Sequence, residues 1–238
     1  MLEGLEIESC RDVYLQSCAN ICEPFKADGF RYAKSGPKMS KKSGEYTFTV
    51  SFQSSRYNSP GTSVCIWIHA NVYSPAMKKW RSNNMSLGGA NTCVAGGQIG
   101  NLRKKHSWME WNVASAELRG GKIQLAIEAI RTIALPYFAA FEDVPAMCER
   151  LEREEVPSME LEERIDFLAR YATTQAVQNA VKQFVAEHRD EQLGFEITRA
   201  MHVIRRNEEL DRVFTADCKT ITRAIVIFNL DEKFVLGK

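Results

Sequence analysis

The spacing of apolar residues changes along the first half of the chain. Residues 9–26 carry apolar side chains three and four positions apart, from Cys10 to Phe25, which predicts an amphipathic helix. Residues 45–53 alternate strictly between apolar and polar side chains, and residues 62–73 do so with many β-branched residues. The stretch between them is rich in Ser, Asn, Pro and Gly. We therefore expect two antiparallel strands joined by a loop.

Weaker patterns predict further short elements in this half. We expect strands at 30–33, near 98–102 and at 108–113, and a short helix at 75–81 that begins with a proline. The intervening stretches 35–44 and 82–97 are expected to be loops, because they lack apolar periodicity.

From about residue 118 onward the apolar spacing becomes helical. Ile123, Ile127 and Ile130 begin a stripe that Pro136 should end or kink. Similar stripes follow within 161–172, 177–185, 193–204 and 210–214. The predicted fold class is therefore α+β, with an N-terminal helix and a small antiparallel sheet followed by an all-helical C-terminal half. We expect an α+β domain at 1–148 and a helical tail or small helical domain at 149–238.

The composition and the number of cysteines predict the class of protein and its cellular compartment. The 238 residues are 45% hydrophobic and 26% charged, which is typical of a globular protein. No apolar run of about 18 residues is present, and the acidic N-terminus lacks an apolar stretch, so we expect neither a membrane partner nor a secretory signal. Seven cysteines, an odd number, favour free thiols and a cytoplasmic location.

Charge is distributed unevenly although the formal net charge is only +1. Residues 26–105 hold thirteen basic and two acidic side chains, whereas residues 142–165 hold nine acidic side chains and three arginines. Such an acidic stretch could steer a basic protein partner, and the basic stretch could attract a polyanion. The alternatives are that these are ordinary solvated surfaces or that the two halves face each other.

The two long strands suggest a binding surface. If they pair as a hairpin, their polar positions lie on one face of the sheet, which is too polar for a core and unusually aromatic for a solvent surface. Such a face suits contact with a base, a sugar ring or a protein side chain; alternatively, the C-terminal helices cover it. The candidate binding residues are Thr47, Thr49, Ser51, Gln53, Trp67, His69, Asn71 and Tyr73.

Basic residues offer a second candidate surface. Lysine and arginine can neutralise phosphates while tryptophans such as Trp67 or Trp80 stack on bases, so nucleic acid is a possible partner. Lysines in loops also serve solubility alone. The members of this basic patch are Lys41, Lys42, Arg56, Arg103, Lys104 and Lys105.

Motifs for catalysis or metal binding are absent from the sequence. It has no GxSxG, GxGxxG or CxxC pattern, and its four histidines are scattered. We therefore assign no catalytic residue and expect no cofactor and no metal site. An enzyme with an unrecognised site around His69, beside Tyr73, remains an alternative, because imidazole titrates near neutral pH.

A set of short motifs resembles a bacterial domain family of unknown function. The helix ends in Gly29-Phe30, the first long strand reads FTVSFQSS over residues 48–55, and Trp108 and Trp111 follow later. The resemblance covers about residues 9–145 and implies a fold but no assigned chemistry. Small α+β families of this kind are sometimes proposed to be immunity proteins that antagonise toxins, which by analogy implies a protein partner.

We therefore expect a non-catalytic bacterial cytoplasmic binding protein, an immunity-type toxin antagonist or another protein-interaction module. Nucleic-acid binding and an enzyme at His69 are the alternatives. The sequence leaves the oligomeric state open.

Overall fold

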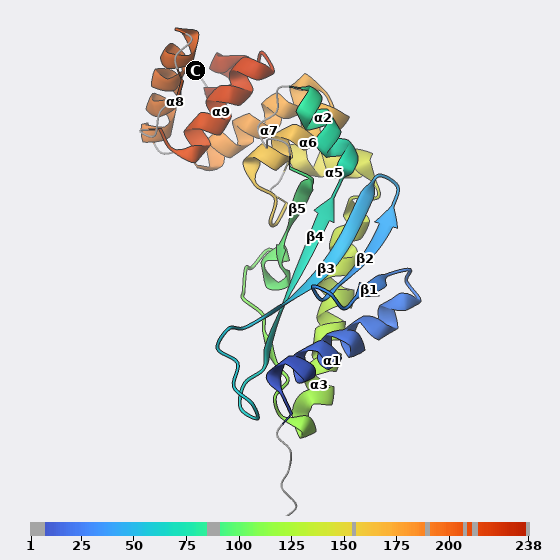
Figure 1. Ribbon diagram of the computed structural model, residues 1–238. Helices are drawn as coiled ribbons and strands as arrows, with labels where there is room; N and C mark the ends of the chain where they lie inside the picture. Colours follow the sequence, from blue (N-terminus) through green and yellow to red (C-terminus); the bar gives the residue numbers. More distant parts are fainter. Residues whose placement is uncertain are drawn as a thin grey trace, which may run out of the picture. The chain divides into compact units, whose positions relative to one another are not determined.

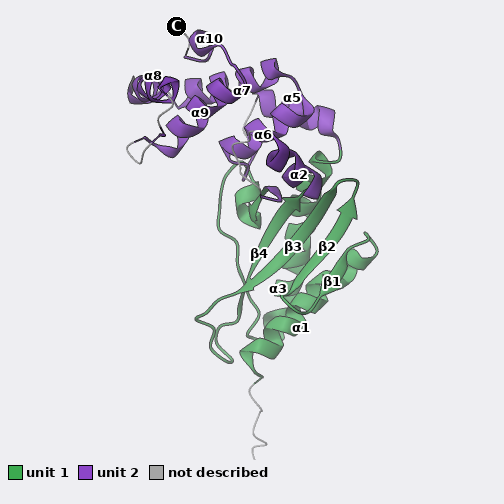
Figure 2. Ribbon diagram, turned by 45° about the horizontal axis from the view of Figure 1, so that its top comes forward, with its two compact units in different colours: residues 1–74, 95–142 green, residues 75–94, 143–238 purple. Residues whose placement is uncertain are grey.

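The computed structural model describes residues 8–84, 91–153, 156–188, 191–206, 209–210 and 214–236. Its contacts divide the chain into two compact units (Figure 2). The sheet unit comprises residues 1–74 and 95–142, and the helical unit comprises residues 75–94 and 143–238. The predicted α+β class is confirmed, with an N-terminal helix, a mostly antiparallel sheet and a largely helical C-terminal half. The predicted domain boundary after residue 148 stays a prediction.

Within the described residues the sheet has six strands. Five of them follow the spatial order β1-β2-β3-β4-β5 (Figure 1), and β6 pairs with β4. The pairs β1–β2, β2–β3, β3–β4 and β4–β6 are antiparallel. The strands are β1 (Arg31–Ala33), β2 (Lys38–Ser43), β3 (Tyr46–Ser54), β4 (Cys65–Tyr73), β5 (Cys93–Gln98) and β6 (Trp111–Asn112).

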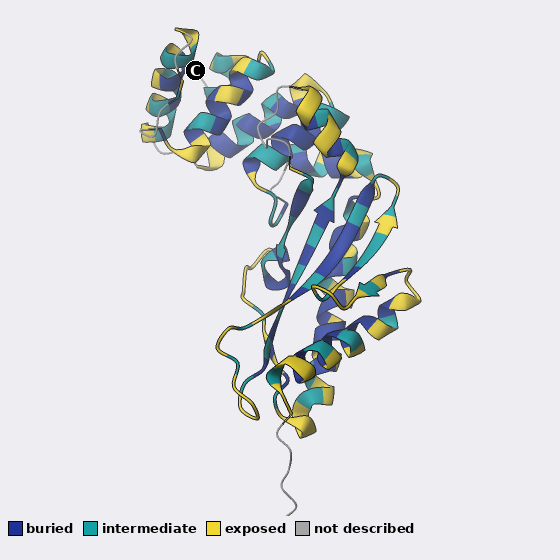
Figure 3. Cartoon of the chain, in the orientation of Figure 1, coloured by how far each residue is buried: buried dark blue, intermediate teal, exposed yellow. Residues whose placement is uncertain are grey.

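One face of the sheet, here called the inner face, forms the core of the sheet unit. Phe48 and Val50 of β3 and Ile66 and Ile68 of β4 are buried, as their alternation predicts (Figure 3). Phe48 stacks on Phe138, with ring centroids 4.9 Å apart. The inner face is covered by α1 (Cys10–Cys22), the 3-10 helix η1 (Glu23–Lys26), α3 (Ala116–Ala129), the π-helical turn η3 (Ile130–Ala134) and α4 (Leu135–Ala140).

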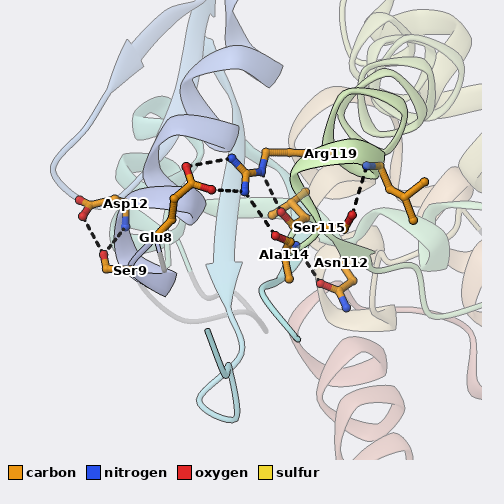
Figure 4. A network of polar contacts seen from close by, with 9 residues as sticks. Glu8, Ser9, Asp12, Asn112, Ala114, Ser115 and Arg119 are labelled. Atoms are coloured by element: carbon orange, nitrogen blue, oxygen red, sulfur yellow. Dashed lines mark hydrogen bonds and ion pairs between the residues drawn. The ribbon is translucent and has the colours of Figure 1, made fainter. Parts of the chain in front are cut away.

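Arg119 ties the start of α3 to the start of α1 (Figure 4). Its guanidinium donates to both carboxylate oxygens of Glu8, at 3.2 and 2.6 Å, and to the backbone oxygens of Val113 and Ala114. Ser115 accepts a hydrogen bond from the Leu118 amide and so caps α3. The arginine thus satisfies carbonyl groups where the chain leaves β6 and enters the helix.

The structure corrects the prediction that residues 35–44 form a loop. They contain β2, whose alternation was hard to see because Met39 is its single large apolar side chain pointing into the core. The turns at Gly36 and Gly44, where φ is +67° and +56°, bound this strand on both sides. Paired glycine turns about eight residues apart are the sequence signal that would have found it.

Two other predicted elements also need correction. Only Trp111–Asn112 of the predicted strand 108–113 pairs with β4. The strand expected near 98–102 lies earlier, as β5, and Ile99–Leu102 form the 3-10 helix η2 instead. Of the two outcomes predicted at Pro136, an end or a kink, the helix does not end there: the wide π-helical turn η3 precedes the proline and the helix continues as α4.

Among the described residues, the helix over residues 116–140 is long enough and apolar enough to span a membrane, judged by length and composition alone. In its most apolar 18-residue window 44% of the residues are buried. Its buried side packs in the sheet unit, through contacts such as Phe138 on Phe48. This packing is that of a core helix in a folded domain.

A buried ion pair joins two helices of the helical unit. Arg81, on α2, donates from Nε to the Asp166 carboxylate of α6 at 2.9 Å, and both side chains are almost fully buried. Arg81 Nη1 also donates to the backbone oxygens of Asn91 and Cys93. The helices of this unit are α2 (Pro75–Asn83), α5 (Val144–Arg153), α6 (Leu161–Tyr171), α7 (Thr174–Glu187), α8 (Glu191–Arg205), α9 (Ala216–Ile227) and α10 (Glu232–Leu236).

Breaking this ion pair should destabilise the protein strongly. Asp166→Ala leaves the Arg81 charge buried without its partner, which typically costs about 3 kcal/mol or more of unfolding free energy. Urea denaturation followed by circular dichroism measures the loss. The control is Glu23→Gln, which removes an exposed ion pair with Lys26 and should change stability little. Equal stabilities of the Asp166 and Glu23 variants would contradict the prediction.

Two glycines should respond to alanine in opposite directions. Gly96 has a φ of +140°, and a Cβ there would collide with the backbone of Ala70 and Asn71, so Gly96→Ala should lower the melting temperature. A Cβ at Gly121, within α3, meets nothing within 4 Å, so Gly121→Ala should raise stability by roughly 0.5–1 kcal/mol. Melting temperatures of the two variants measure these opposite changes in stability. A stabilised Gly96→Ala protein would refute the close approach of β5 to β4.

Candidate functional site

The face opposite the core, here called the outer face, carries all eight sheet residues that the sequence proposed. The register of β3 with β4 places Thr47 opposite Tyr73, Thr49 opposite Asn71, Ser51 opposite His69 and Gln53 opposite Trp67. Directly opposed residues of an antiparallel pair point to the same face. Thr49 is buried, Gln53 is exposed, and the other six are half-buried. The predicted clustering of these side chains is therefore present in the structure.

An aromatic cluster lies at one part of the outer face. The ring of Trp108 meets Trp67 edge-on, with centroids 5.4 Å apart, and approaches His69 at 6.5 Å in the same manner. Trp67 Nε1 donates to the Glu110 carboxylate at 3.1 Å, and His69 Nε2 lies 3.1 Å from Gln53 Oε1. Trp108 nevertheless remains 55% exposed. The cluster is thus a large aromatic surface held in place by neighbouring rings.

His69 is the titratable member of this cluster. Its partial burial lowers its pKa below the ordinary value of 6.5, so the neutral imidazole is the favoured form at pH 7. A neutral ring paired with the amide of Gln53 has one nitrogen as donor and the other as acceptor. This arrangement favours a hydrogen-bonding and packing role.

Sequence reasoning did not place basic side chains on the outer face, although it included Lys42 in the basic patch. Ser40 pairs with both Thr49 and Arg31, Lys38 pairs with Ser51, and Lys42 pairs with Thr47, so these residues share that face. Their place on this face was not foreseen because the segment 35–44 was predicted to be a loop. The outer face therefore has an aromatic part on β4 and the segment before β6, and a basic part on β1 and β2.

Strand geometry separates three residues of the predicted basic patch. Lys41 and Lys42 are consecutive in β2 and so point to opposite faces of the sheet. Arg56 follows the end of β3 at Ser54, which lies about 23 Å along the strand from Thr47, the residue opposite Lys42, at ~3.3 Å per residue. Arg103, Lys104 and Lys105 are exposed in the segment after η2. A single surface formed by all six residues stays a prediction.

Much of the acidic stretch 142–165 serves local structure. Glu142 accepts a hydrogen bond from Ser43, and Asp143 accepts one from the Ala146 amide at the start of α5. Glu160 and Glu163 form a capping box at the start of α6, and Glu162 accepts from Thr220. Glu154 and Glu155 lie outside the described residues. These hydrogen bonds come from neutral donors and leave the negative charges in place, so the steering of a basic partner by this stretch stays a prediction.

A model of the DUF4304 family, a domain of unknown function, matches residues 21–140. The chain belongs to this family. The match runs from the end of α1 to α4 and includes every strand, so the aromatic cluster lies inside the DUF4304 domain. The predicted resemblance to a family of unknown function is thereby confirmed. No curated protein and no solved structure matches the chain.

Titration of His69 should be visible in the stability of this DUF4304 protein. Because its folded-state pKa is lowered, the unfolded chain binds the proton first as pH falls below 6.5, and the unfolding free energy should then decrease. His69→Gln should remove this contribution and flatten the dependence. Denaturation between pH 7.5 and 5 tests the slope, and NMR titration of the imidazole gives the midpoint. A midpoint at or above 6.5 would overturn the assignment.

Proposed function

We propose that this DUF4304 protein is a binding protein and that the outer face of its sheet contacts a protein partner. The observation that carries the proposal is Trp108, a large aromatic side chain left 55% exposed although Trp67 and His69 fix its position. Exposing the apolar surface of a tryptophan to water is unfavourable in free energy, and a partner that covers it removes this cost. A tryptophan that is already held in place also loses little conformational entropy on binding. Tryptophan is also among the residues that contribute most to protein interfaces.

The composition around Trp108 supports a protein rather than a small ligand. The neighbouring positions offer hydroxyl, amide and imidazole groups that can exchange hydrogen bonds with a partner's polar atoms, as the periphery of an interface requires. The charged groups Arg31, Lys38 and Lys42 lie toward the other edge of the face. A partner with acidic groups at that edge would associate faster through charge complementarity.

A narrower form of the proposal is that the protein is an immunity-type toxin antagonist. This form requires that the bound partner be a toxin. Such a protein must bind one target tightly, and a preordered aromatic centre suits tight binding. The basic edge of the outer face argues for an acidic contact surface on that target. This differs from the basic target that the acidic stretch 142–165 suggested.

A site-specific photocrosslinker at Ser51, in the middle of the outer face, tests the proposal in host cells. We expect a discrete crosslinked protein that survives nuclease treatment and is lost when Trp108 is changed to alanine. Truncating a central interface tryptophan typically weakens binding by about 2 kcal/mol or more, or about thirtyfold in Kd.

The matched control is Leu125→Ala, which removes a comparably exposed apolar side chain, 59% exposed, from α3. It should leave the crosslink intact. Loss of the crosslink in both variants, or a crosslink that Trp108→Ala leaves unchanged, would contradict the outer face as the contact. Recovery of nuclease-sensitive material only would instead indicate nucleic acid.

A further inference from the structure

A cavity of about 830 Å³ lies in the sheet unit, and none of Trp67, His69 and Trp108 lines it. Its walls come from the first turns of α1, from the turn between β1 and β2, and from the chain that leaves β3. This volume is in the range of pockets that bind small molecules. The residues that the argument uses are Arg11, Tyr14, Lys34, Pro37, Ser54 and Ser55.

The charge of the cavity is positive. Arg11 and Lys34 line it, and none of its described lining residues is acidic. Two carboxylates, Glu8 and Asp12, line an adjacent hollow that Lys34 also lines. Glu8 pairs with Arg119, which balances its charge. Asp12 keeps its charge and offsets the positive end of the α1 dipole, so the positive charge of the cavity comes from Arg11 and Lys34.

The rest of the lining suits an organic molecule better than a bare ion. Tyr14 and Pro37 give the cavity an apolar wall. The Tyr14 hydroxyl donates to the Phe52 carbonyl at 2.7 Å, and burial raises its pKa, so its ring is held in place and stays uncharged. Ser54 and Ser55 supply hydroxyl groups that can bond to an anion or to a sugar.

We propose that this cavity binds a small organic anion. Its phosphate or carboxylate lies against Arg11 and Lys34, and its ring or apolar part lies against Tyr14 and Pro37. A phosphate or carboxylate accepts charge-assisted hydrogen bonds from both cations, which are stronger than neutral ones. The site is independent of the outer face and of the protein partner proposed for it.

Calorimetry with the full-length protein tests the proposal with four probes. AMP carries a phosphate on a ring system, benzoate carries a carboxylate on a ring, adenosine lacks the anion, and inorganic phosphate lacks the ring. We expect AMP or benzoate to bind, and to bind at least about tenfold more tightly than adenosine and inorganic phosphate. Which of the two binds identifies the anion as phosphate or carboxylate.

Substitutions locate the binding. Arg11→Gln and Lys34→Gln should each weaken the bound probe roughly tenfold, since each removes one charge-assisted contact. Both side chains are exposed, so the variants should keep the melting temperature of the unaltered protein. Lys104→Gln, which removes an exposed lysine outside the cavity lining, should not change affinity. Failure of both AMP and benzoate to bind, equal binding of adenosine, or unchanged affinity in both cavity variants would overturn the proposal.

Discussion

The pairing of β3 with β4 is the constraint on which the sheet unit depends. Eight residue pairs join the two strands, and their register assigns Phe48, Val50, Ile66 and Ile68 to the core. The same register assigns the hydroxyl, amide and aromatic side chains to the opposite face. A slip by one residue would exchange the two faces, burying polar groups and exposing the apolar ones. The stability of the core and the composition of the candidate site are therefore consequences of one set of backbone hydrogen bonds.

The sequence predicted those parts of the structure where a single period is strong. The alternation in β3 and β4 identified both faces of the central hairpin, because each strand carries a full run of alternating side chains. The helical spacing within α1, α3, α6, α7 and α8 was equally clear, whereas the stripe expected within 210–214 precedes α9, and residues 211–213 lie outside the described residues. The eight proposed residues of the outer face followed from this alternation alone, and the structure places them on one face.

Other parts could not be predicted because their signal is not local. The strand β2 has one buried apolar side chain, Met39, and is stabilised by hydrogen bonds to both neighbours. The contact of Trp108 with Trp67 joins segments about forty residues apart, and no periodicity reports such a contact. The cavity beside α1 likewise combines three segments that come together only in the fold. Charge counts are limited for a related reason, since they do not show which carboxylates cap helices and which lysines point to opposite faces.

The π-helical turn at Ile130–Ala134 links the covering helix to the proline that follows it. A π-helical turn is wider than the α-helical turn it replaces, because its N–H groups bond to carbonyls five residues back, as the Leu135 N–H does to the Ile130 oxygen. Ile127 before the turn and Phe138 after it are both buried. The wider turn also relieves the clash between a proline ring and the preceding carbonyl that a regular helix would impose at Pro136. The wide turn and the proline are thus coupled, because a regular α-helical turn at this place would restore the clash at Pro136.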